Sequence, residues 1–391
     1  MDVWDKTVKP EENSYFNKDK PIIRERKNKS TDFIHIDLFS GCGGFSCGFE
    51  QAGFITEVAL DIHCPSIETI DLNHKYTSTI LGDIRKVSPS TIRELISDQK
   101  SNIVMTAGVP CQGFSRSNRK RNDNDERNFY FKEFIKFAKI IKPKVVVIEN
   151  VSGISVAKQG YFFSSISKEL EKLGFKVSTS LLNAADYGVP QTRKRFFFIG
   201  IRSEYNWLFP YGTHNLDNYI TVEDSIIGDL PKLSNNEFKE LYKSKPTSEY
   251  QKLIRGSNNK LTNHKAPNHP EKTIETIKNT VPGQPMYSNF KQRVRLNPAL
   301  PSPTQICGGI RPQFQFGHPI QARGLSIRER ARIQSFPDNY HFIGGLVQGR
   351  VQTGNAVPVL LSKAIATQIK KMLLGKKLKG FNGQSSQNKL I

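Results

Sequence analysis

One stretch decides the fold class of the chain: Phe33-Ile34-His35-Ile36-Asp37-Leu38-Phe39-Ser40-Gly41-Cys42-Gly43-Gly44. Residues 33–39 form an apolar run that predicts a buried strand. The glycines that follow predict a tight turn, and apolar residues at helical spacing over 45–52 predict a helix. A strand that passes through a glycine-rich turn into a helix is typical of the first unit of a parallel α/β sheet.

The same alternation continues along the chain. Apolar strands are predicted over 56–60, 103–109, 144–148 and 196–201, and helices over 129–141 and 164–173. The helix over 129–141 has an apolar face that contains Phe131, Phe134, Ile135, Ala138 and Ile141. Continuous apolar strands that alternate with helices favour an α/β fold with a doubly wound, mostly parallel sheet that is covered on both faces.

The charge balance and the cysteines narrow the class of protein. The 391 residues include 57 basic and 36 acidic ones, and the net charge of +21 favours a polyanionic partner, although any soluble protein with a basic surface would share it. No apolar run approaches the ~20 residues of a membrane-spanning helix, and the first residues lack an apolar signal segment. A cytoplasmic protein without a membrane partner is therefore expected. Five cysteines without a CxxC pair argue against a disulfide framework, and no metal is expected.

The residue composition of the sequence changes after about residue 203. Pro, Asn, Lys and Ser become frequent, and clear alternation disappears until about residue 325. Between residues 232 and 295 there are 13 basic and five acidic residues. This stretch predicts a second, smaller and less regular domain with a basic face. The segment 1–32 is predicted to be a polar N-terminal extension, partly disordered, and 376–391 a loose tail.

Polar residues at predicted strand ends indicate a ligand pocket, because open parallel sheets bind ligands beyond the carboxyl ends of their strands. The glycine turn over 40–44 lets a ligand approach the backbone, Asp61 suits a ribose diol, and Asp83 suits an adenine amino group. The turn is not GxGxxG, which disfavours a dinucleotide. Each feature alone fits a tight turn or a surface acid. Together they favour a nucleoside ligand without phosphate contacts, such as S-adenosylmethionine.

Three further features have the chemistry of an active site. Cys111 follows the strand over 103–109, where an activated thiol would be a nucleophile, although a lone cysteine is more often inert and buried. Glu149 ends an apolar strand, where a carboxyl group is costly unless it is used or paired. Alternation would place Arg193 and Arg195 on one face, which suits a phosphate, a carboxylate or a plain surface pair.

These segments together resemble the ordered motifs of the DNA cytosine-5 methyltransferase family of bacterial restriction-modification systems. The matching segments are 37–44, 110–115 (Pro-Cys-Gln-Gly-Phe-Ser), 149–151 (Glu-Asn-Val), 191–195 (Gln-Thr-Arg-Lys-Arg) and 354–358 (Gly-Asn-Ala-Val-Pro). One such motif is weak, but five in order are specific. The resemblance implies an S-adenosylmethionine-dependent methyltransferase fold. Its parts would be a catalytic domain over 33–202, a target recognition domain and hinge over 203–340, and a return to the catalytic domain over 341–375.

The resemblance also implies a reaction. Members of the family transfer a methyl group from S-adenosylmethionine to C5 of a cytosine that is flipped out of a specific duplex DNA sequence. Cys111 would add to C6 of the base, Glu149 would hold N3 and supply a proton there, and Arg193 and Arg195 would hold the base, its phosphate or Glu149. The chain is then expected to be a monomeric, nucleoid-associated methylase of a restriction-modification system, with a cognate endonuclease as a functional partner.

The motif positions imply further contacts. The cofactor positions are Phe39, Ser40, Gly41, Cys42, Gly43, Gly44, Asp61, Ile62, Asp83, Ile84, Pro110, Asn355 and Val357. At Ile62 many relatives have a larger, flatter residue, so the packing of the adenine is expected to differ here. DNA contacts are expected from the loop residues Gln112, Ser115, Arg116, Arg119, Lys120 and Arg121. In the second domain, side chains with chemistry suited to base edges are Gln251, Arg255, Asn258 and Asn259, although a solvated role fits each of them singly.

Two other functions stay open on the sequence. An enzyme that methylates cytosine in RNA, such as transfer RNA, would share the catalytic motifs, although the long basic second domain favours duplex DNA. A non-catalytic DNA-binding protein would keep the fold, although the intact Cys111, Glu149 and two arginines argue against it.

Overall fold

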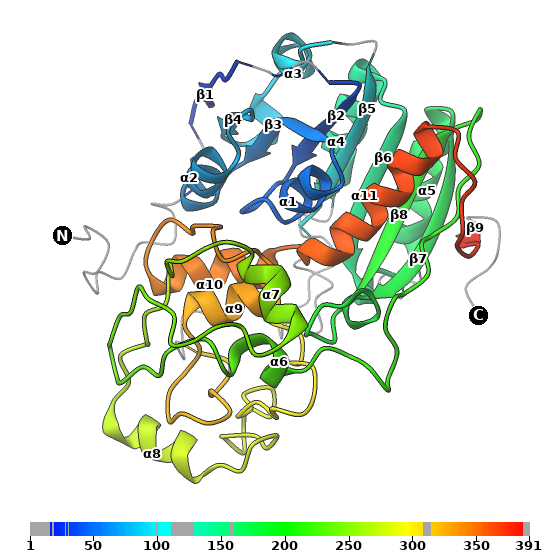
Figure 1. Ribbon diagram of the computed structural model, residues 1–391. Coiled ribbons are helices and arrows are strands. Elements are labelled where there is room, and N and C mark those ends of the chain that lie inside the picture. The colour runs from blue at the N-terminus through cyan, green and yellow to red at the C-terminus, as the bar shows by residue number, and fades with distance from the viewer. Residues whose placement is uncertain are drawn as a thin grey trace. The chain divides into compact units, whose positions relative to one another are not determined.

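The computed structural model of the protein describes residues 16–17, 19–27, 29, 31–98, 101–110, 129–155, 160–307 and 314–385. The chain forms two compact units (Figure 1). The sheet unit contains the described residues of 10–183, 194–212 and 361–391, and the loop-rich unit contains those of 184–193 and 213–360. No helix among the described residues is both long and apolar enough to cross a membrane.

Among the described residues, nine strands form the sheet at the centre of the sheet unit. In spatial order they are β1 (Ile22–Arg24), β4 (Ser78–Leu81), β3 (Ile55–Asp61), β2 (Phe33–Leu38), β5 (Asn102–Gly108), β6 (Val145–Val151), β8 (Lys194–Arg202), β7 (Phe175–Asn183) and β9 (Gln384–Ser385). The neighbours from β4 to β6 run parallel, and the remaining pairs run antiparallel. The α/β fold with a parallel centre is confirmed, and the sheet is mixed toward both edges.

The sequence predicted neither the direction of β8 nor the presence of β7. An apolar run contains no signal for strand direction, and β8 lies antiparallel between β6 and β7, with Phe198 opposite both Ile148 and Thr179. In β7, a polar Thr179 is buried while Leu181 is 44% exposed. These two positions blur the alternation that would otherwise have marked the strand.

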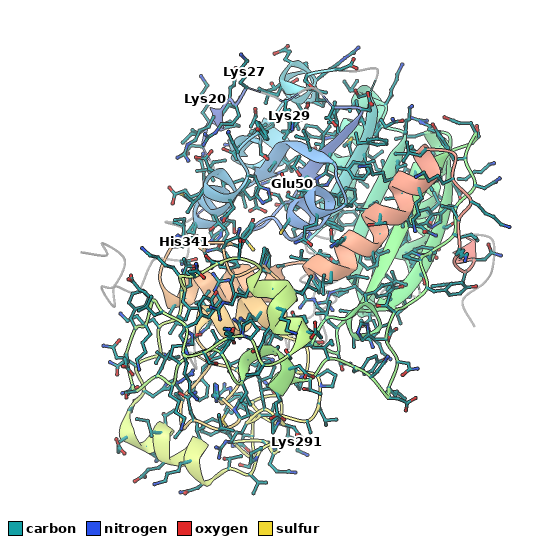
Figure 2. The ribbon with its side chains drawn as sticks, in the orientation of Figure 1. Lys20, Lys27, Lys29, Glu50, Lys291 and His341 are labelled. Carbon is teal, nitrogen blue, oxygen red and sulfur yellow. The ribbon has the colours of Figure 1, made fainter. Side chains whose placement is uncertain are left out.

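The N-terminal extension also contributes to the sheet, which begins before Phe33. Ile23 of β1 lies opposite Ile80 of β4. The side chains of β1 are exposed, and the exposed lysines Lys20, Lys27 and Lys29 lie on the same unit (Figure 2). A strand of three residues is too short to show a period, which is why the sequence did not reveal it.

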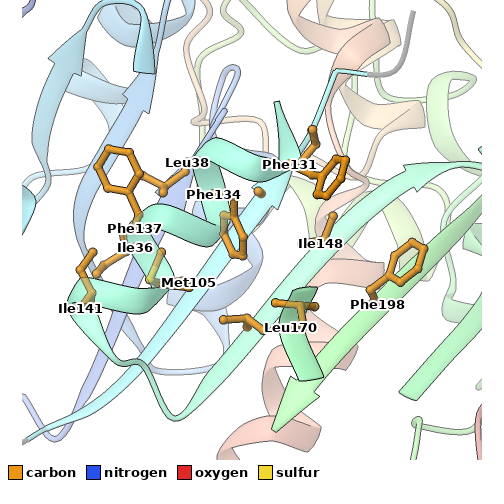
Figure 3. Close-up of a cluster of buried hydrophobic side chains, with 14 of the residues drawn as sticks. Ile36, Leu38, Met105, Phe131, Phe134, Phe137, Ile141, Ile148, Leu170 and Phe198 are labelled. Carbon is orange, nitrogen blue, oxygen red and sulfur yellow. The ribbon is translucent and has the colours of Figure 1, made fainter. Parts of the chain in front are cut away.

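Helices cover both faces of the sheet. Ile36 and Leu38 of β2 point to one face, where they join Phe134 and Phe137 of α4 (Phe131–Ile141) in the main core (Figure 3). His35 points to the opposite face and stacks on Phe49 of α1 (Gly44–Gln51), with ring centroids 4.1 Å apart. The other helices of this unit are α2 (Cys64–Asn73), α3 (Pro89–Leu95), α5 (Tyr161–Lys172) and, from residue 361 on, α11 (Val359–Leu373).

The buried face of α4 differs in two positions from the sequence prediction. Phe131, Phe134, Ala138 and Ile141 are buried as expected, but Ile135 is only partly buried. Phe137, which the predicted face omitted, is 1% exposed and belongs to the core. The core-facing stripe of a helix is wide enough to include both positions, so tertiary packing decides between them.

The loop-rich unit is organised around α9 (Ile327–Ile333), all seven residues of which are buried. Its other helices are α6 (Val222–Ile226), α7 (Glu249–Arg255), α8 (Glu271–Asn279) and α10 (Leu346–Asn355). Arg332 pairs with Asp229 at 2.7 Å and with Asp338 at 2.6 Å, and all three side chains are fully buried. These buried ion pairs thus join α9 to the two segments that contain Asp229 and Asp338.

Candidate active site

The turn after β2 has a backbone conformation that few residues adopt. Phe39, Gly41 and Gly43 have φ angles of 56°, 52° and 87°, in the left-handed region. Glycine adopts this region freely, whereas phenylalanine is strained there, and such strain collects at ligand sites. A Cβ added at Gly41 would meet no described atom within 4 Å. The predicted glycine turn is therefore present, and no described atom crowds Gly41.

A buried carboxylate holds this turn in place. Gly43 is the N-cap of α1 and has no side chain to accept from the free N–H groups of the helix. Asp37 of β2 supplies the acceptor, because its Oδ2 accepts from the main-chain N and the Oγ of Ser46 at 3.2 and 2.7 Å. Its Oδ1 accepts from Oγ1 of Thr106 at 2.9 Å. Burial raises the pKa of Asp37 to about 6, although these donors favour the charged form.

Asp61 lies at the end of β3, where the sequence placed it, and binds the glycine turn. Its Oδ2 accepts from the N–H of Gly41 and its Oδ1 from the N–H of His63, both at 2.8 Å. Each carboxylate oxygen can accept a second hydrogen bond, so a ribose contact remains compatible with this arrangement. Ile62 beside it is half-buried.

Asp83 follows β4 and forms an ion pair with Arg85, with 2.6 Å between Nη2 and Oδ2. The hydrogen bonds from Arg85 lower the pKa of Asp83. The guanidinium group of Arg85 also lies over the ring of Tyr130, which stacks on Phe39 with centroids 6.0 Å apart. This series of contacts joins the end of β4 to the glycine turn. Sequence reasoning missed Arg85, which is near Asp83 in the chain, and Tyr130, which only tertiary structure brings there.

Three other residues that were expected to contact the cofactor are buried in the structure. Ile84 is 3% exposed and belongs to the main core, and Cys42 is fully buried. Burial raises the pKa of the Cys42 thiol, so this cysteine is an inert core residue. Ser40 is 8% exposed, and its Oγ donates to the main-chain oxygen of Leu60 at 3.3 Å.

Glu149 lies at the carboxyl edge of the sheet beside the glycine turn. It is opposite Gly108 on the neighbouring strand β5. A Cβ added at Gly108 would lie 3.7 Å from the carbonyl oxygen of Phe39 and 4.0 Å from Oε2 of Glu149. The turn and the carboxylate therefore border the same strand end. Ligands of open parallel sheets bind at this position, beyond the carboxyl ends of the strands.

Arg195 of β8 pairs with Glu149 across the antiparallel ladder. Its Nε lies 2.9 Å from Oε1 of Glu149, and the two side chains are 13% and 10% exposed. Such partial burial strengthens the pair, since fewer water molecules compete for the charges. The pair fixes the direction in which the Glu149 carboxylate points.

Arg193 does not lie on β8, which begins at Lys194. It belongs to the loop-rich unit, where its guanidinium donates to the main-chain oxygens of Gln305 and Gly354 at 2.8 and 3.1 Å. The alternation argument that paired it with Arg195 assumed one continuous strand and was wrong in that respect.

The remaining motif residues differ in their exposure. Asn355 is the last residue of α10 and is exposed, while Val357 is 5% exposed. Pro110 is half-buried after β5. The expected nucleophile and DNA contacts lie outside the described residues, namely Cys111, Gln112, Ser115, Arg116, Arg119, Lys120 and Arg121. Among the described residues no group of His, Cys, Asp or Glu could hold a metal ion.

Three of the four base-reading candidates are used in internal contacts. Gln251 is fully buried and donates to the main-chain oxygen of Ile227 at 2.7 Å. Arg255 lies over the ring of Tyr242 and donates to Ser244, and Asn258 donates to the main-chain oxygen of Lys260. Asn259 is exposed. Amide and guanidinium chemistry alone does not separate structural from base-reading positions.

The fold is the one that S-adenosylmethionine-dependent methyltransferases adopt. The chain superposes on a solved structure from an Escherichia coli prophage, described as a DNA modification methyltransferase, with a TM-score of 0.74 and 24% identity. The match covers 88% of this chain and 99% of that one. Within this class the chain belongs to the C-5 cytosine-specific DNA methylase family, whose model matches residues 33–371.

Two relatives are similar over most of their length. The type II methyltransferase M1.HphI of Haemophilus parahaemolyticus is 35% identical over 350 residues, which are 86% of this chain and 87% of that protein. The type II methyltransferase M.DdeI of Desulfomicrobium norvegicum is 35% identical over 368 residues, with 85% and 88% covered. The chain is thus an enzyme, a DNA cytosine-5 methyltransferase. An RNA methyltransferase and a non-catalytic binding protein do not fit this family.

Proposed function

We propose that the protein methylates C5 of a flipped-out cytosine in a specific duplex DNA sequence, with S-adenosylmethionine as methyl donor. The observation that carries the proposal is the Glu149–Arg195 pair, which borders the strand end next to the glycine turn. The names of the relatives further support a role in a type II restriction-modification system, with a cognate endonuclease as functional partner. A cytoplasmic, nucleoid-associated location and a monomeric state stay predictions.

The cofactor fits the residues that are present. The uncrowded Gly41 and the strained Phe39 suit a ligand at the turn, and Asp61 and Asp83 offer polar groups for a nucleoside. The motif resemblance also implies a contact from Asn355. When bound, S-adenosylmethionine would supply an activated methyl group. The ion pair of Asp83 with Arg85 implies that an adenine amino group would either share the Asp83 carboxylate with Arg85 or displace it.

The chain's own residues would carry out the rest of the reaction. The Cys111 thiolate would add to C6 of the cytosine while Glu149 supplies a proton at N3, which turns C5 into an enamine-like carbon able to take up the methyl group. Loss of the C5 proton would then expel Cys111 and restore the ring. Arg195 would keep the Glu149 carboxyl group aimed at the base. The loop residues Gln112, Ser115, Arg116, Arg119, Lys120 and Arg121 would contact the DNA.

Bisulfite sequencing of plasmid DNA from cells that express the protein tests this function and reports the recognition sequence. The proposal expects methylated cytosines within one short sequence, and none in cells that express Cys111→Ser. Purified enzyme is also expected to form a stable adduct with duplex DNA that carries 5-fluorocytosine, since the fluorine cannot leave as a proton does. Methylation that persists in Cys111→Ser, or an active enzyme that forms no adduct, would contradict covalent attack by Cys111.

A further inference from the structure

One buried guanidinium joins three segments of the loop-rich unit. Arg193 is 2% exposed. Its Nη1 donates to the main-chain oxygen of Gln305 at 2.8 Å, and its Nη2 donates to that of Gly354 at 3.1 Å. The planar fork of arginine suits this task, because its donors point in fixed directions toward two separate acceptors.

The buried side chains of Gln191 and Gln334 join the same segments through the main chain of Gln305 and Thr353. The Oε1 of Gln191 accepts from the main-chain N of Gln305 at 2.8 Å, and its Nε2 donates to Oε1 of Gln334 at 2.9 Å. Gln334 in turn donates to the main-chain oxygen of Thr353 at 2.5 Å. All three glutamines are fully buried. Buried hydrogen-bond networks of this kind hold a backbone in one arrangement.

The C-terminal end of α10 lies in close contact with the main chain of residues 306–307, directly after Gln305. A Cβ added at Gly354 would clash with the main chain of Ile306 and Cys307, so only glycine permits the observed approach. Gly354 and Ala356 are buried, whereas Asn355 between them is exposed. The segment therefore presents one polar side chain from a rigid support.

We propose that Arg193 is a positioning residue for the cofactor and acts through Gly354 on Asn355. Its two carbonyl acceptors and its burial favour this role over a direct contact with the base or its phosphate. The inference rests on the proposed function, in which Asn355 contacts S-adenosylmethionine. Arg193 and Arg195, although two residues apart, would then serve different steps: cofactor binding and base activation.

Initial rates of methyl transfer at varied S-adenosylmethionine test the proposal with Arg193→Met and Arg193→Lys. Loss of the charged hydrogen bonds is expected to raise KM for the cofactor about tenfold in Arg193→Met and less in Arg193→Lys, which keeps one donor. The value of kcat at saturating cofactor is expected to stay within about threefold of wild type. A fall in kcat at unchanged KM would overturn the proposal and favour a contact with the base or phosphate.

A double-variant cycle separates this role from a general loss of structure. In an Asn355→Ala background, Arg193→Met is expected to add less than about twofold to KM, because both changes remove one contact. Additive effects would overturn the proposal. If Arg193→Met does not fold, the same cycle with Arg193→Lys decides the result.

A matched control is Arg328→Lys, since Arg328 is fully buried in the same unit and donates to the main-chain oxygens of Thr262 and Tyr340. It is expected to lower stability while KM for the cofactor stays within about twofold, and an equal rise in KM would overturn the proposal. Failure of the proposed function is distinguishable, because wild-type protein would then bind no S-adenosylmethionine in calorimetry before any variant is compared.

Discussion

At the scale of single residues, the Glu149–Arg195 pair shows how a strand end is prepared for chemistry. A carboxyl group at the end of an apolar strand would be costly alone, and the arginine on the neighbouring antiparallel strand both compensates and orients it. The side chains stay slightly exposed, at 10% and 13%, so a base can still reach the carboxylate.

Replacement of either partner is expected to slow the chemical step. Glu149→Gln keeps the shape but cannot supply the proton, and kcat is expected to fall by about 10²- to 10⁴-fold. Arg195→Lys loses the Nε geometry, and a smaller fall of about tenfold or more is expected. Single-turnover methyl transfer measures both, and KM for the cofactor is the internal control. A normal rate in Glu149→Gln would remove this residue from the mechanism.

Sequence reasoning placed the polar residues better than it assigned their partners. Asp61 ends β3 as expected, because the apolar run over 56–60 marks that strand. Glu149 lies in β6 two residues before its end, and Asp83 lies two residues after β4, a strand that the sequence did not predict. The hydrogen bonds of Asp61 to Gly41 and of Asp83 to Arg85 depend on how turns fold back, which spacing does not encode. The nucleophile and the expected DNA loop lie outside the described residues, so their assignment stays a prediction.

At the scale of elements, α9 is a fully buried helix whose charged side chains join the segments around it. It begins with a capping box, in which Ser326 and Glu329 satisfy each other's main-chain N–H groups. Arg328, Arg330 and Arg332 each bind a different part of the loop-rich unit. The sequence indicated that regularity returns near residue 325, but it predicted no helix over 327–333, since a helix that buries arginine and glutamate beside its apolar residues does not show a clear apolar stripe.

Removal of one partner from the buried charge cluster is expected to destabilise this unit strongly. Asp229→Ala leaves Arg332 with a single carboxylate, and a loss of about 3 kcal/mol in unfolding free energy is expected. Glu249→Ala is the matched control, because it breaks the exposed pair with Lys252 on α7 and should cost less than about 1 kcal/mol. Urea unfolding measures both, and equal losses would show that burial does not decide the strength of these pairs.

A buried histidine in the same unit predicts a loss of stability in acid. The Nδ1 of His318 accepts from the N–H groups of Ile320 and Gln321 at 3.2 and 3.1 Å, so the ring is neutral on that side. Burial lowers the pKa of His318 to about 3. An unfolded histidine takes up a proton near pH 6.5, so this stability is fully present above pH 6.5 and is lost as the pH falls toward 3.

The variant His318→Gln isolates this effect, because glutamine does not titrate. Between pH 6.5 and pH 5 the wild-type protein is expected to lose about 2 kcal/mol of unfolding free energy relative to the variant. Urea unfolding at the two pH values measures the difference. A difference that is constant with pH would mean that the pKa of His318 is the same in the folded and the unfolded chain.

At the scale of the whole molecule, a net charge of +21 is shared by both units. Figure 2 labels Lys20, Lys27 and Lys29 on the sheet unit and Lys291 on the loop-rich unit, and all four are exposed. Charges of this kind draw a polyanion toward the protein but do not read its sequence. Composition therefore predicted the class of partner, while the residues that choose a recognition sequence need the structure of a complex.

DNA affinity is expected to depend steeply on salt. If six to ten phosphates are contacted, as is common for DNA-binding proteins, the affinity should fall by about 10³- to 10⁵-fold between 50 and 200 mM salt. Fluorescence anisotropy with a labelled duplex measures the slope, and a duplex without the recognition sequence should give a similar slope. A flat profile would mean that phosphate contacts contribute little.

The left-handed backbone of Phe39 has a consequence for engineering. A residue with a Cβ costs about 1–2 kcal/mol in that conformation, which glycine would avoid. Glycine at this position would also remove the ring that stacks on Tyr130. Because the Phe39 ring also packs against the main core, its loss would offset the relieved strain, and a laboratory selection for thermal stability is not expected to favour glycine here.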